Sequence, residues 1–540
     1  MGTSYKRFEE VWFVKMETIT KLEKKRLEMQ AALDNQKKLE DRNKLGQFAT
    51  PSDLATDILK YAKKLFQPRK KVAFFDPAIG TGSFYSALLK TFPSSRIVQS
   101  KGFELDSLYG NPSIQFWEHA DLDITLADFT KQELPKPSNR FNLIICNPPY
   151  VRHHHLLAEE KKRLQTLVQS VTGLKLSGLS GLYCYFLLLS HAWLDSDGIA
   201  GWLIPSEFMD VNYGRSIKHY LKENVTLLRI HRFNPNNVQF KDALVSSVVA
   251  WFRKTKPPQN HKVEFSFGGT LLEPKFSAFV DAKSLDINSK WTHYPIVNKA
   301  SKNGHLKLSD LFVIKRGLAT GSNKFFILSE EKINKLQLPK ECFKPILPSP
   351  RYFQINEILA DDKGYPDIEN RLFLLDSTLS EEEIQKRYPN LWKYLSTGIK
   401  NKVNEQYLCR HRYPWYSQEK RLPAPMLCTY LGRSKANDGC PFRFILNNSN
   451  AVVANVYLNL YPKPTLARVL KSKPFLLKII WKALNELQAE TLLSEGRVYG
   501  GGLHKLEPKE LGNVSANTIA SLLPKTIRSI PQQVELFTDM

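Results

Sequence analysis

Cysteine is scarce in this sequence and is scattered along it. The 540 residues include six cysteines, with no CxxC pair and no zinc-ribbon spacing among them. A disulfide-bonded secreted scaffold and a structural zinc site are therefore both disfavoured, and we expect a reducing, cytoplasmic compartment. The six positions are Cys146, Cys184, Cys342, Cys409, Cys428 and Cys440.

Long hydrophobic runs are absent as well. Residues 1–10 are polar and contain no signal-peptide core. No stretch of about 18 apolar residues exists that could span a membrane. The most apolar segment, residues 182–194, is interrupted by Ser190 and His191, which is typical of a buried core helix. We therefore expect no membrane-spanning segment.

Acidic residues are outnumbered by basic ones. Lys and Arg total 77 against 53 Asp and Glu, which gives a formal net charge of +24. A charge of this size favours a polyanionic partner, nucleic acid first and an anionic membrane surface second. The hydrophobic content of 42% is ordinary for a soluble globular protein, and the length allows two or three domains.

Changes in amino-acid composition and hydrophobic pattern divide the chain into four segments. Residues 1–45 are rich in Lys, Glu and Gln, and we expect a helical extension that packs on the main body or pairs with a partner such as a second copy. Residues 46–285 alternate apolar runs with amphipathic stretches, which predicts a Rossmann-like α/β domain with a mainly parallel, doubly wound sheet. Residues 286–300 are a linker. Residues 301–540 combine short strands, turns and basic–aromatic loops, which predicts an α+β domain. The expected strands of the α/β domain are 72–75, 97–103, 124–126, 143–146, 198–204, 227–233, 247–252 and a final one at 263–267.

The most informative motif is Asn147-Pro148-Pro149-Tyr150, which follows the apolar run at 141–146. Two prolines cannot continue a central strand, so the chain must turn there. In an open α/β sheet, ligands bind at the carboxyl ends of the strands. The Asn147 side chain and the Pro148 carbonyl offer acceptors, and Tyr150 offers an aromatic face. Together these groups suit a planar amino group.

A Gly-rich turn at residues 74–84 joins the first expected strand to a helix. Gly80 and Gly82 permit tight backbone geometry and close approach of a ligand. The turn lacks the full GxGxxG pattern of dinucleotide binders and the Gly-Lys-Ser/Thr of a P-loop, which disfavours a triphosphate.

Carboxylates stand at three successive strand ends. Asp76 follows the first expected strand, Glu104 the second, and Asp128 with the ring of Phe129 the third. Glu104 occupies the place where doubly wound folds put an acidic residue on ribose hydroxyls. An acidic, aromatic pocket without phosphate-binding residues suits a cationic adenosine derivative, and S-adenosylmethionine is that ligand.

In this order, the motifs resemble those of N6-adenine DNA methyltransferases of the gamma arrangement, from type II restriction-modification systems. The resemblance covers nearly all of the chain after residue 45, and its C-terminal part is similar to the TaqI-like specificity domain, a target recognition domain. It implies methyl transfer from S-adenosylmethionine to N6 of an adenine flipped out of duplex DNA, which would protect host DNA. It also implies double-stranded DNA and a cognate restriction endonuclease as partners.

The resemblance assigns the cofactor contacts residue by residue. Thr50, in the segment 46–51, would contact the methionine part of the cofactor, and Asp76 would lie near its amino group. Glu104 would bind the ribose. The cofactor adenine would be held by the remaining three residues, which are Asp128, Phe129 and Phe186.

The target adenine would be held between two rings, Tyr150 and Phe240, with Phe233 as the main rival for the second place. Unstacking a base costs a few kcal/mol, and aromatic stacking recovers roughly 1–3 kcal/mol per base, so both rings would be needed. Neither a cysteine nucleophile nor a metal is required. We interpret His153–His155 as a polar loop near DNA.

Three basic loops of the C-terminal region, at residues 315–324, 410–416 and 499–505, resemble segments of the family's specificity region. Arg and Lys can clamp phosphates or read guanine edges in the major groove, and the sequence leaves open which residue does which. The candidate DNA-binding residues are Arg316, Lys324, Arg410, Arg412 and Lys505.

Three other functions stay open. The Asn-Pro-Pro-Tyr turn also suits the planar amino groups of protein glutamine or ribosomal RNA. A bifunctional restriction-methylation enzyme would need a nuclease core, and only scattered Glu-x-Lys triplets such as 507–509 are present. A non-catalytic DNA-binding partner is the third alternative.

Overall fold

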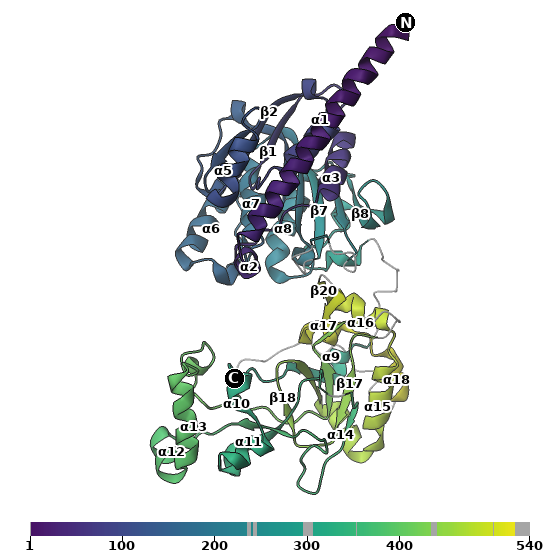
Figure 1. Ribbon diagram of the computed structural model, residues 1–540. Helices are drawn as coiled ribbons and strands as arrows, with labels where there is room; N and C mark the ends of the chain where they lie inside the picture. The colour runs from purple at the N-terminus through teal and green to yellow at the C-terminus, as the bar shows by residue number, and fades with distance from the viewer. Residues whose placement is uncertain are drawn as a thin grey trace. The chain divides into compact units, whose positions relative to one another are not determined.

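The computed structural model describes residues 2–234, 239–240, 246–294, 306–352, 354–433, 440–499 and 502–523. The chain separates into two compact units (Figure 1), the first consisting mainly of Met1–Ala300 and the second mainly of Ser301–Val498 and Gly502–Met540. The domain borders expected at residues 45, 285 and 300 stay predictions.

A nine-stranded sheet forms the centre of the first unit. Its strands are β1 (Val72–Asp76), β2 (Ile97–Glu104), β3 (Asp123–Leu126), β4 (Phe141–Cys146), β5 (Leu194–Pro205), β6 (Thr226–Arg232), β7 (Ser247–Arg253), β8 (Lys262–Gly269) and β9 (Pro274–Asp281). The order in space is β3-β2-β1-β4-β5-β7-β6-β8-β9. The first five strands of this order run parallel to one another. The predicted Rossmann-like, mainly parallel α/β domain is therefore confirmed.

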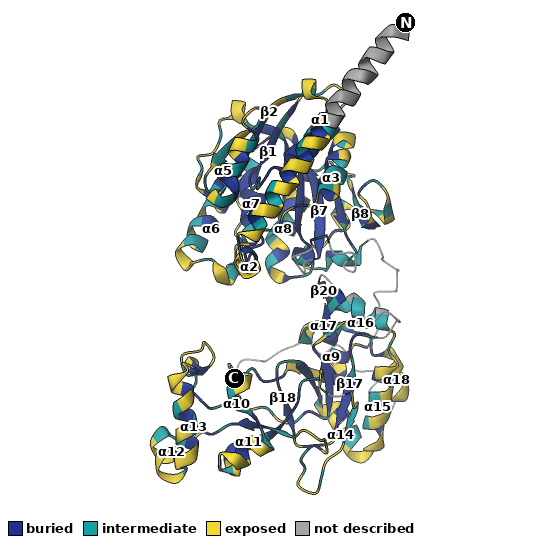
Figure 2. Ribbon diagram, in the orientation of Figure 1, coloured by how far each residue is buried: buried dark blue, intermediate teal, exposed yellow. Residues whose placement is uncertain are grey.

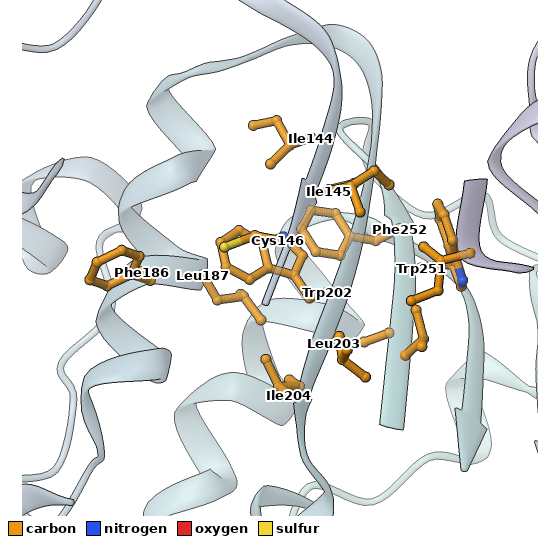
Figure 3. Close-up of a cluster of buried hydrophobic side chains, with 14 of the residues drawn as sticks. Ile144, Ile145, Cys146, Phe186, Leu187, Trp202, Leu203, Ile204, Trp251 and Phe252 are labelled. Carbon is orange, nitrogen blue, oxygen red and sulfur yellow. The ribbon is translucent and has the colours of Figure 1, made fainter. Parts of the chain in front are cut away.

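Strands β1 and β4 read as nearly continuous apolar runs because both of their faces are covered, whereas β2 and β3 are more exposed. In β4, the side chains of Ile144, Ile145 and Cys146 are buried (Figure 3), and they share one core with Trp202 of β5 and Trp251 of β7. Figure 2 shows the same distribution, with dark blue strands and yellow outer faces on the helices.

The far half of the sheet departs from the doubly wound pattern. Strand β7 is antiparallel to both β5 and β6, and β9 is antiparallel to β8. Pro257 and Pro258 lie in the connection between β7 and β8, and the strand expected at 263–267 is β8. Strand β9 was not expected, because it lies at the sheet edge with five of its eight residues exposed.

Helices cover the sheet of the first unit (Figure 1). Their bounds are α1 (Gly2–Asn35), α2 (Leu39–Leu45), α3 (Ser52–Leu65), α4 (Ser83–Thr91), α5 (Ser107–Phe116), α6 (Ala158–Thr172), α7 (Leu182–Leu189) and α8 (Arg215–His219). Helix α1 packs against α4 and α5, and Ile19 and Leu33 of its apolar stripe are buried. The expected N-terminal helix therefore packs on the main body of its own chain.

The second unit is α+β, as predicted. Three sheets carry its strands, in the order β10-β19-β15-β17-β13, β11-β14-β12-β18 and β16-β21-β20. The strands are β10 (Phe312–Arg316), β11 (Ile327–Ser329), β12 (Phe343–Leu347), β13 (Glu357–Ile358), β14 (Leu372–Leu375), β15 (Met426–Thr429), β16 (Leu431–Arg433), β17 (Phe444–Asn447), β18 (Val452–Val453), β19 (Tyr457–Pro462), β20 (Arg497–Tyr499) and β21 (Leu503–Lys505). The helices are α9 (Leu308–Leu311), α10 (Asn323–Phe326), α11 (Glu330–Lys335), α12 (Glu381–Arg387), α13 (Pro389–Lys400), α14 (Pro464–Ser472), α15 (Phe475–Asn485), α16 (Ala489–Glu495), α17 (Pro508–Asn513) and α18 (Asn517–Leu522).

Separate hydrophobic clusters hold the second unit together. One lies between the β10-β19-β15-β17-β13 sheet and the helices α14 to α18, and another joins the β11-β14-β12-β18 sheet to α12 and α13. None of the helices in the described ranges is long and apolar enough to cross a membrane.

Candidate functional site

The candidate site lies where β1 and β4 run side by side. Strand order reverses at this point, because β2 and β3 lie on one side of β1 while β4 and β5 lie on the other. Asp76 ends β1, and Asn147 directly follows β4. Since Phe75 of β1 is paired with Ile144 of β4, both strands present their carboxyl ends at the same edge. Open α/β sheets bind their ligands at such a reversal of strand order.

Asn147 is held in one orientation and keeps an acceptor without a partner. Its Nδ2 donates to the carbonyl of Phe48 (2.9 Å) and to Oγ1 of Thr50 (3.1 Å). Because a carbonyl can only accept, this contact fixes which end of the amide points toward Phe48. The Oδ1 atom is buried and has no hydrogen-bond partner in the described part of the chain. A buried acceptor in this state is suited to an N–H donor of a ligand.

The backbone of Tyr150 lies directly against the segment at 46–51. Its N–H donates to the carbonyl of Gly46 at 3.2 Å, and its hydroxyl donates to the carbonyl of Leu203 at 3.0 Å. Gly46 has φ +64°, and a Cβ at this position would lie 2.2 Å from the Tyr150 nitrogen. Only glycine fits here, for both reasons.

Three rings gather beside Asn147. The ring centroids of Tyr150 and Phe240 lie 6.1 Å apart at 87°, and Phe48 lies 5.8 Å from Tyr150 and 6.1 Å from Phe240. Phe233, the rival for the role of Phe240, instead contacts His231 of β6 at 4.8 Å. Sequence reasoning missed Phe48 as a member of this cluster, although its place three residues before Pro51 could have indicated it.

The Gly-rich turn between β1 and α4 is tightly closed. Gly80 and Gly82 adopt φ values of +54° and +84°, which favour glycine. A Cβ on Gly82 would lie 2.5 Å from Nε1 of Trp117, and this indole nitrogen donates to the carbonyl of Thr81 at 3.1 Å. The turn is therefore fixed by the helix that follows β2.

Glu104 braces the same turn. Its Oε2 accepts from the N–H of Gly80 at 3.0 Å, and its Oε1 accepts from the N–H of Asp106 at 2.8 Å. Burial raises the pKa of Glu104, although these backbone N–H groups oppose the shift. Each carboxylate oxygen retains lone pairs, so Glu104 can hold the turn and accept from a ribose hydroxyl.

Asp76 is 1% exposed and has few partners. It accepts from the N–H of Ala78 at 3.1 Å, and burial raises its pKa to about 7. The neighbouring Cys146 thiol is fully buried, and its pKa is raised well above its usual value, first by burial and then by Asp76. Cys146 therefore remains a neutral thiol and is no nucleophile.

The third strand end brings Asp128, Phe129 and Phe186 together. Oδ1 of Asp128 accepts from the N–H and the hydroxyl of Thr130, both at 2.8 Å. The rings of Phe129 and Phe186 lie 5.2 Å apart, and Phe129 also contacts Phe75 of β1. Both rings are buried, so they are part of the core as well as candidates for a ligand contact.

Two of the predicted DNA loops are packed together in the second unit. Nη1 of Arg412 donates to the carbonyl of Thr320 (2.8 Å) and Nη2 to that of Ala319 (2.5 Å), so this guanidinium joins the loops. Arg410 and Lys324 are exposed. Tyr413, beside Arg412, is 97% exposed. The loop pair therefore presents basic and aromatic groups to solvent.

The other two candidates share one aromatic ring. The guanidinium of Arg316 lies 4.0 Å from the centroid of Tyr430, and the ammonium of Lys505 lies 5.1 Å from it. Arg316 also donates to the carbonyl of Asn455 at 3.0 Å, and Lys505 pairs with Glu507 at 2.7 Å. Both cations are thus held in place by neighbours of their own unit.

No group of three or more His, Cys, Asp or Glu side chains that could hold a metal ion is found within the residues that the structure describes. His153–His155 form a short 3₁₀ turn. The pKa of His154 is lowered, first by desolvation and then by its two histidine neighbours.

Comparisons with known proteins agree for both units. Residues 90–239 match the family Eco57I restriction-modification methylase, and residues 289–535 match the family Type II methyltransferase M.Eco57I, C-terminal domain. Two curated relatives are similar over most of their length. Type II methyltransferase M.AccI of Acinetobacter calcoaceticus is 26% identical over 490 residues, covering 88% of this chain and 85% of the relative. Type II methyltransferase M.XamI of Xanthomonas campestris pv. amaranthicola is 25% identical over 484 residues, covering 88% and 86%.

Among solved structures, the DNA complex of the Type IIL restriction-modification enzyme MmeI is similar to this chain with a TM-score of 0.51 and 13% identity. The match covers 92% of this chain and 66% of that one. At this identity the likeness concerns the fold alone.

Proposed function

We propose that this chain, which is similar to the type II methyltransferases of restriction-modification systems, methylates N6 of an adenine rotated out of duplex DNA. The observation that carries this proposal is the buried, unpartnered Oδ1 of Asn147 beside the Tyr150 and Phe240 rings. An exocyclic amino group needs an acceptor of this kind, and the flat base needs the rings.

Stacking on the two rings would offset the free energy needed to extract the base from the duplex. An adenine inside a duplex hides N6 between its neighbours, and unstacking it costs a few kcal/mol. Stacking on aromatic side chains returns roughly 1–3 kcal/mol. Tyr150 is suited to this task because its hydroxyl bonds to Leu203 and its N–H to Gly46, so the ring is held before the base arrives.

Two hydrogen-bond acceptors would then orient the N6 nitrogen of the extruded adenine toward the methyl group. Oδ1 of Asn147 and the carbonyl of Pro148 would take one N6 hydrogen each, which turns the nitrogen lone pair away from the adenine ring. A bond would form between N6 and the methyl carbon as the bond between that carbon and the donor sulfur breaks, and one N6 proton would pass to water. Proximity and orientation would contribute to the acceleration of such an in-line displacement.

The residues at the strand ends fit S-adenosylmethionine, which would supply the methyl group from its sulfonium. Asp76 is a buried carboxylate with one short backbone contact, so it can pair with an ammonium group. Glu104 can accept from ribose hydroxyls while it braces the Gly-rich turn. Asp128 and Phe129, with Phe186 beside them, would hold the adenine of the donor.

Thr50 has a second part in the proposal. Its hydroxyl accepts from Nδ2 of Asn147 at 3.1 Å, so it orients the amide that would bind the target base. The proposed contact of Thr50 with the methionine part of the cofactor would place one residue between the two substrates.

The DNA-binding surface of the second unit would use its exposed cations. Arg410 and Lys324 are exposed beside Tyr413, and Arg316 and Lys505 flank Tyr430. We assign Arg412 a supporting role, because its guanidinium is committed to backbone carbonyls.

Methyl transfer from tritiated S-adenosylmethionine tests the proposal. The protein is incubated with genomic duplex DNA, with RNA or with release-factor protein, and the modified base is identified by nuclease digestion and mass spectrometry. We expect N6-methyladenine in DNA. Label in protein or RNA with none in DNA would overturn the proposal, as would a methylated cytosine. Magnesium-dependent cleavage of plasmid DNA would instead identify a bifunctional enzyme.

A further inference from the structure

Helix α1 contributes a buried ion pair to the first unit. Glu23 and Arg26 are 5% and 1% exposed. Two nitrogens of the guanidinium bond to the two carboxylate oxygens, Nε to Oε2 at 2.8 Å and Nη2 to Oε1 at 2.7 Å. Burial alone would raise the pKa of Glu23, but the hydrogen bonds and charge of Arg26 outweigh it and lower the pKa to about 2. The pair is therefore ionised at any working pH.

This pair joins two segments that surround the proposed cofactor site. Nη1 of Arg26 donates to Oγ1 of Thr81 at 2.9 Å, and Thr81 lies between the two glycines of the Gly-rich turn. The hydroxyl of Ser52, next to the segment at 46–51, donates to Glu23. One turn further along α1, Gln30 accepts from the Thr81 hydroxyl at 2.5 Å.

The C-terminal end of α1 reaches a third segment. Asp34 accepts from the hydroxyl of Tyr109 in α5 at 2.9 Å. Just beyond the helix, Lys37 pairs with Asp106 at 2.6 Å, and Gln47 donates to the same carboxylate at 2.8 Å. Asp106 is two residues after Glu104, the proposed ribose ligand. The helix and Lys37, two residues beyond its end, thus contact all three segments.

Stability alone is a weak reason for such a pair. Replacing a buried ion pair by apolar residues of similar volume is often neutral or stabilising, because the pair must repay its lost hydration. What the pair does supply is a fixed orientation of its hydrogen bonds, because the planar guanidinium holds its N–H donors in a rigid arrangement. Its third nitrogen, Nη1, donates to the side chain of Thr81, which lies between Gly80 and Gly82.

We propose that Glu23 and Arg26 are positioning residues for the cofactor, which hold the Gly-rich turn and the 46–52 segment in their binding geometry. The inference rests on the proposed use of S-adenosylmethionine at this edge of the sheet. It makes α1 a wall of the cofactor site, and it requires that contacts of α1 with Thr81 control cofactor affinity while the chemical step is left to Asn147 and its neighbours.

The test is the double variant Glu23→Leu/Arg26→Met, in the full chain. It removes both charges together, so no uncompensated buried charge is created. We expect a melting temperature close to that of the wild type and an S-adenosylmethionine Kd raised about 10- to 100-fold, as expected for a displaced binding loop. KM for the cofactor should rise with Kd, while kcat at saturating cofactor and the Kd for duplex DNA stay unchanged.

Two further variants keep the test decisive. Gln30→Met removes the second partner of Thr81 from a half-buried position, and we expect it to raise Kd about threefold to tenfold, the effect of one hydrogen bond. Lys25→Met is the matched control, because Lys25 is exposed on the same helix next to Arg26. If the double variant does not fold, Gln30→Met decides the matter.

Unchanged cofactor affinity in the folded double variant or in Gln30→Met would overturn the inference and leave the proposed function intact. An equal loss of DNA affinity would overturn it too, because the effect would then be general. A wild-type protein that binds no S-adenosylmethionine in calorimetry would remove the proposed function together with this inference.

Discussion

The two sides of the candidate site use their polar atoms differently. On the side proposed for the target base, Asn147 donates from Nδ2 to its own chain and has an Oδ1 without a partner in the described part of the chain. On the side proposed for the cofactor, Glu104 and Asp76 accept from backbone N–H groups of their own chain. The proposed base side thus has an unused acceptor, whereas the acceptors of the proposed cofactor side also support its loops. Substitutions on the two sides should therefore fail in different ways.

The largest effect is expected from Asn147→Ala. Without the acceptor, N6 is no longer directed at the methyl carbon, and removal of one such group from a preorganised site costs about 10²- to 10³-fold in kcat. S-adenosylmethionine affinity should stay within a few-fold, because Asp76 and Glu104 keep their contacts. Methyl incorporation at saturating substrates and cofactor calorimetry measure the two quantities. A variant with normal turnover would contradict the role of Asn147.

The second-largest effect is expected from the ring pair of Tyr150 and Phe240. Phe240→Leu removes a stacking surface beside Tyr150 and should weaken binding of the extruded base by about 1–3 kcal/mol. Phe233→Leu serves as the matched control, since this ring contacts His231 instead. A fluorescent adenine analogue at the target position reports extrusion in both variants. Equal losses of extrusion in the two variants would show that Phe240 has no special part.

The cofactor side should respond to pH. Because the pKa of Asp76 is about 7, the carboxyl is neutral below that value and cannot pair with an ammonium group. Cofactor affinity should therefore fall by up to about tenfold for each pH unit below 7 and level off above it. Calorimetry from pH 5.5 to 8.5 would show this, and Asp76→Asn should bind weakly with no such slope. A flat wild-type profile would argue against Asp76 as the ammonium partner.

The same carboxyl should affect stability with the opposite sign. A carboxyl whose pKa is raised from 3.8 to about 7 on folding stabilises the folded protein fully below pH 3.8 and loses this contribution as pH rises through 7. Asp76→Asn should therefore raise the melting temperature at pH 8 by a few degrees and change it little at pH 5. A variant that melts lower at pH 8 would contradict the assigned pKa.

The smallest effects are expected from substitutions of two neighbouring arginines, Arg410 and Arg412. Arg410→Ala should weaken DNA binding and reduce the slope of log K against log salt by about one, with no change in melting temperature. Arg412→Ala should lower the melting temperature instead, because the carbonyls of Ala319 and Thr320 lose their donor. Fluorescence anisotropy at several salt concentrations and thermal melts separate the two. If Arg410→Ala lowered the melting temperature and Arg412→Ala weakened DNA binding instead, the roles assigned to the two arginines would be reversed.

Local motifs were readable from the sequence because they carry their own geometry. The Asn-Pro-Pro-Tyr turn must end a strand, and the parallel order of β1 to β5 then brings Asp76, Glu104 and Asn147 to one edge. Phe240 lies far from Tyr150 in sequence, and only the resemblance to a family suggested that the two rings act together; in the structure their centroids lie 6.1 Å apart.

Contacts that depend on tertiary packing were not readable. Glu23 and Arg26 are two charges among many in a helix rich in Lys and Glu, and nothing local distinguishes them from exposed neighbours such as Lys25. Arg412 and Arg410 likewise look alike in a basic loop, and only the carbonyls of a segment some ninety residues earlier separate their roles. Burial of a charge is decided by its distant partners, which a single sequence does not name.

The close approach of Gly46 to Tyr150 has a consequence for chimaeras. A Cβ at position 46 would overlap the backbone of Tyr150. The loop around Gly46 and the turn around Tyr150 must therefore be compatible, although about a hundred residues separate them in sequence. An engineer who imports the Asn-Pro-Pro-Tyr turn of a relative into this chain, or grafts this turn elsewhere, must bring the facing glycine with it. Directed libraries should accordingly leave position 46 unvaried when they diversify the rest of its loop.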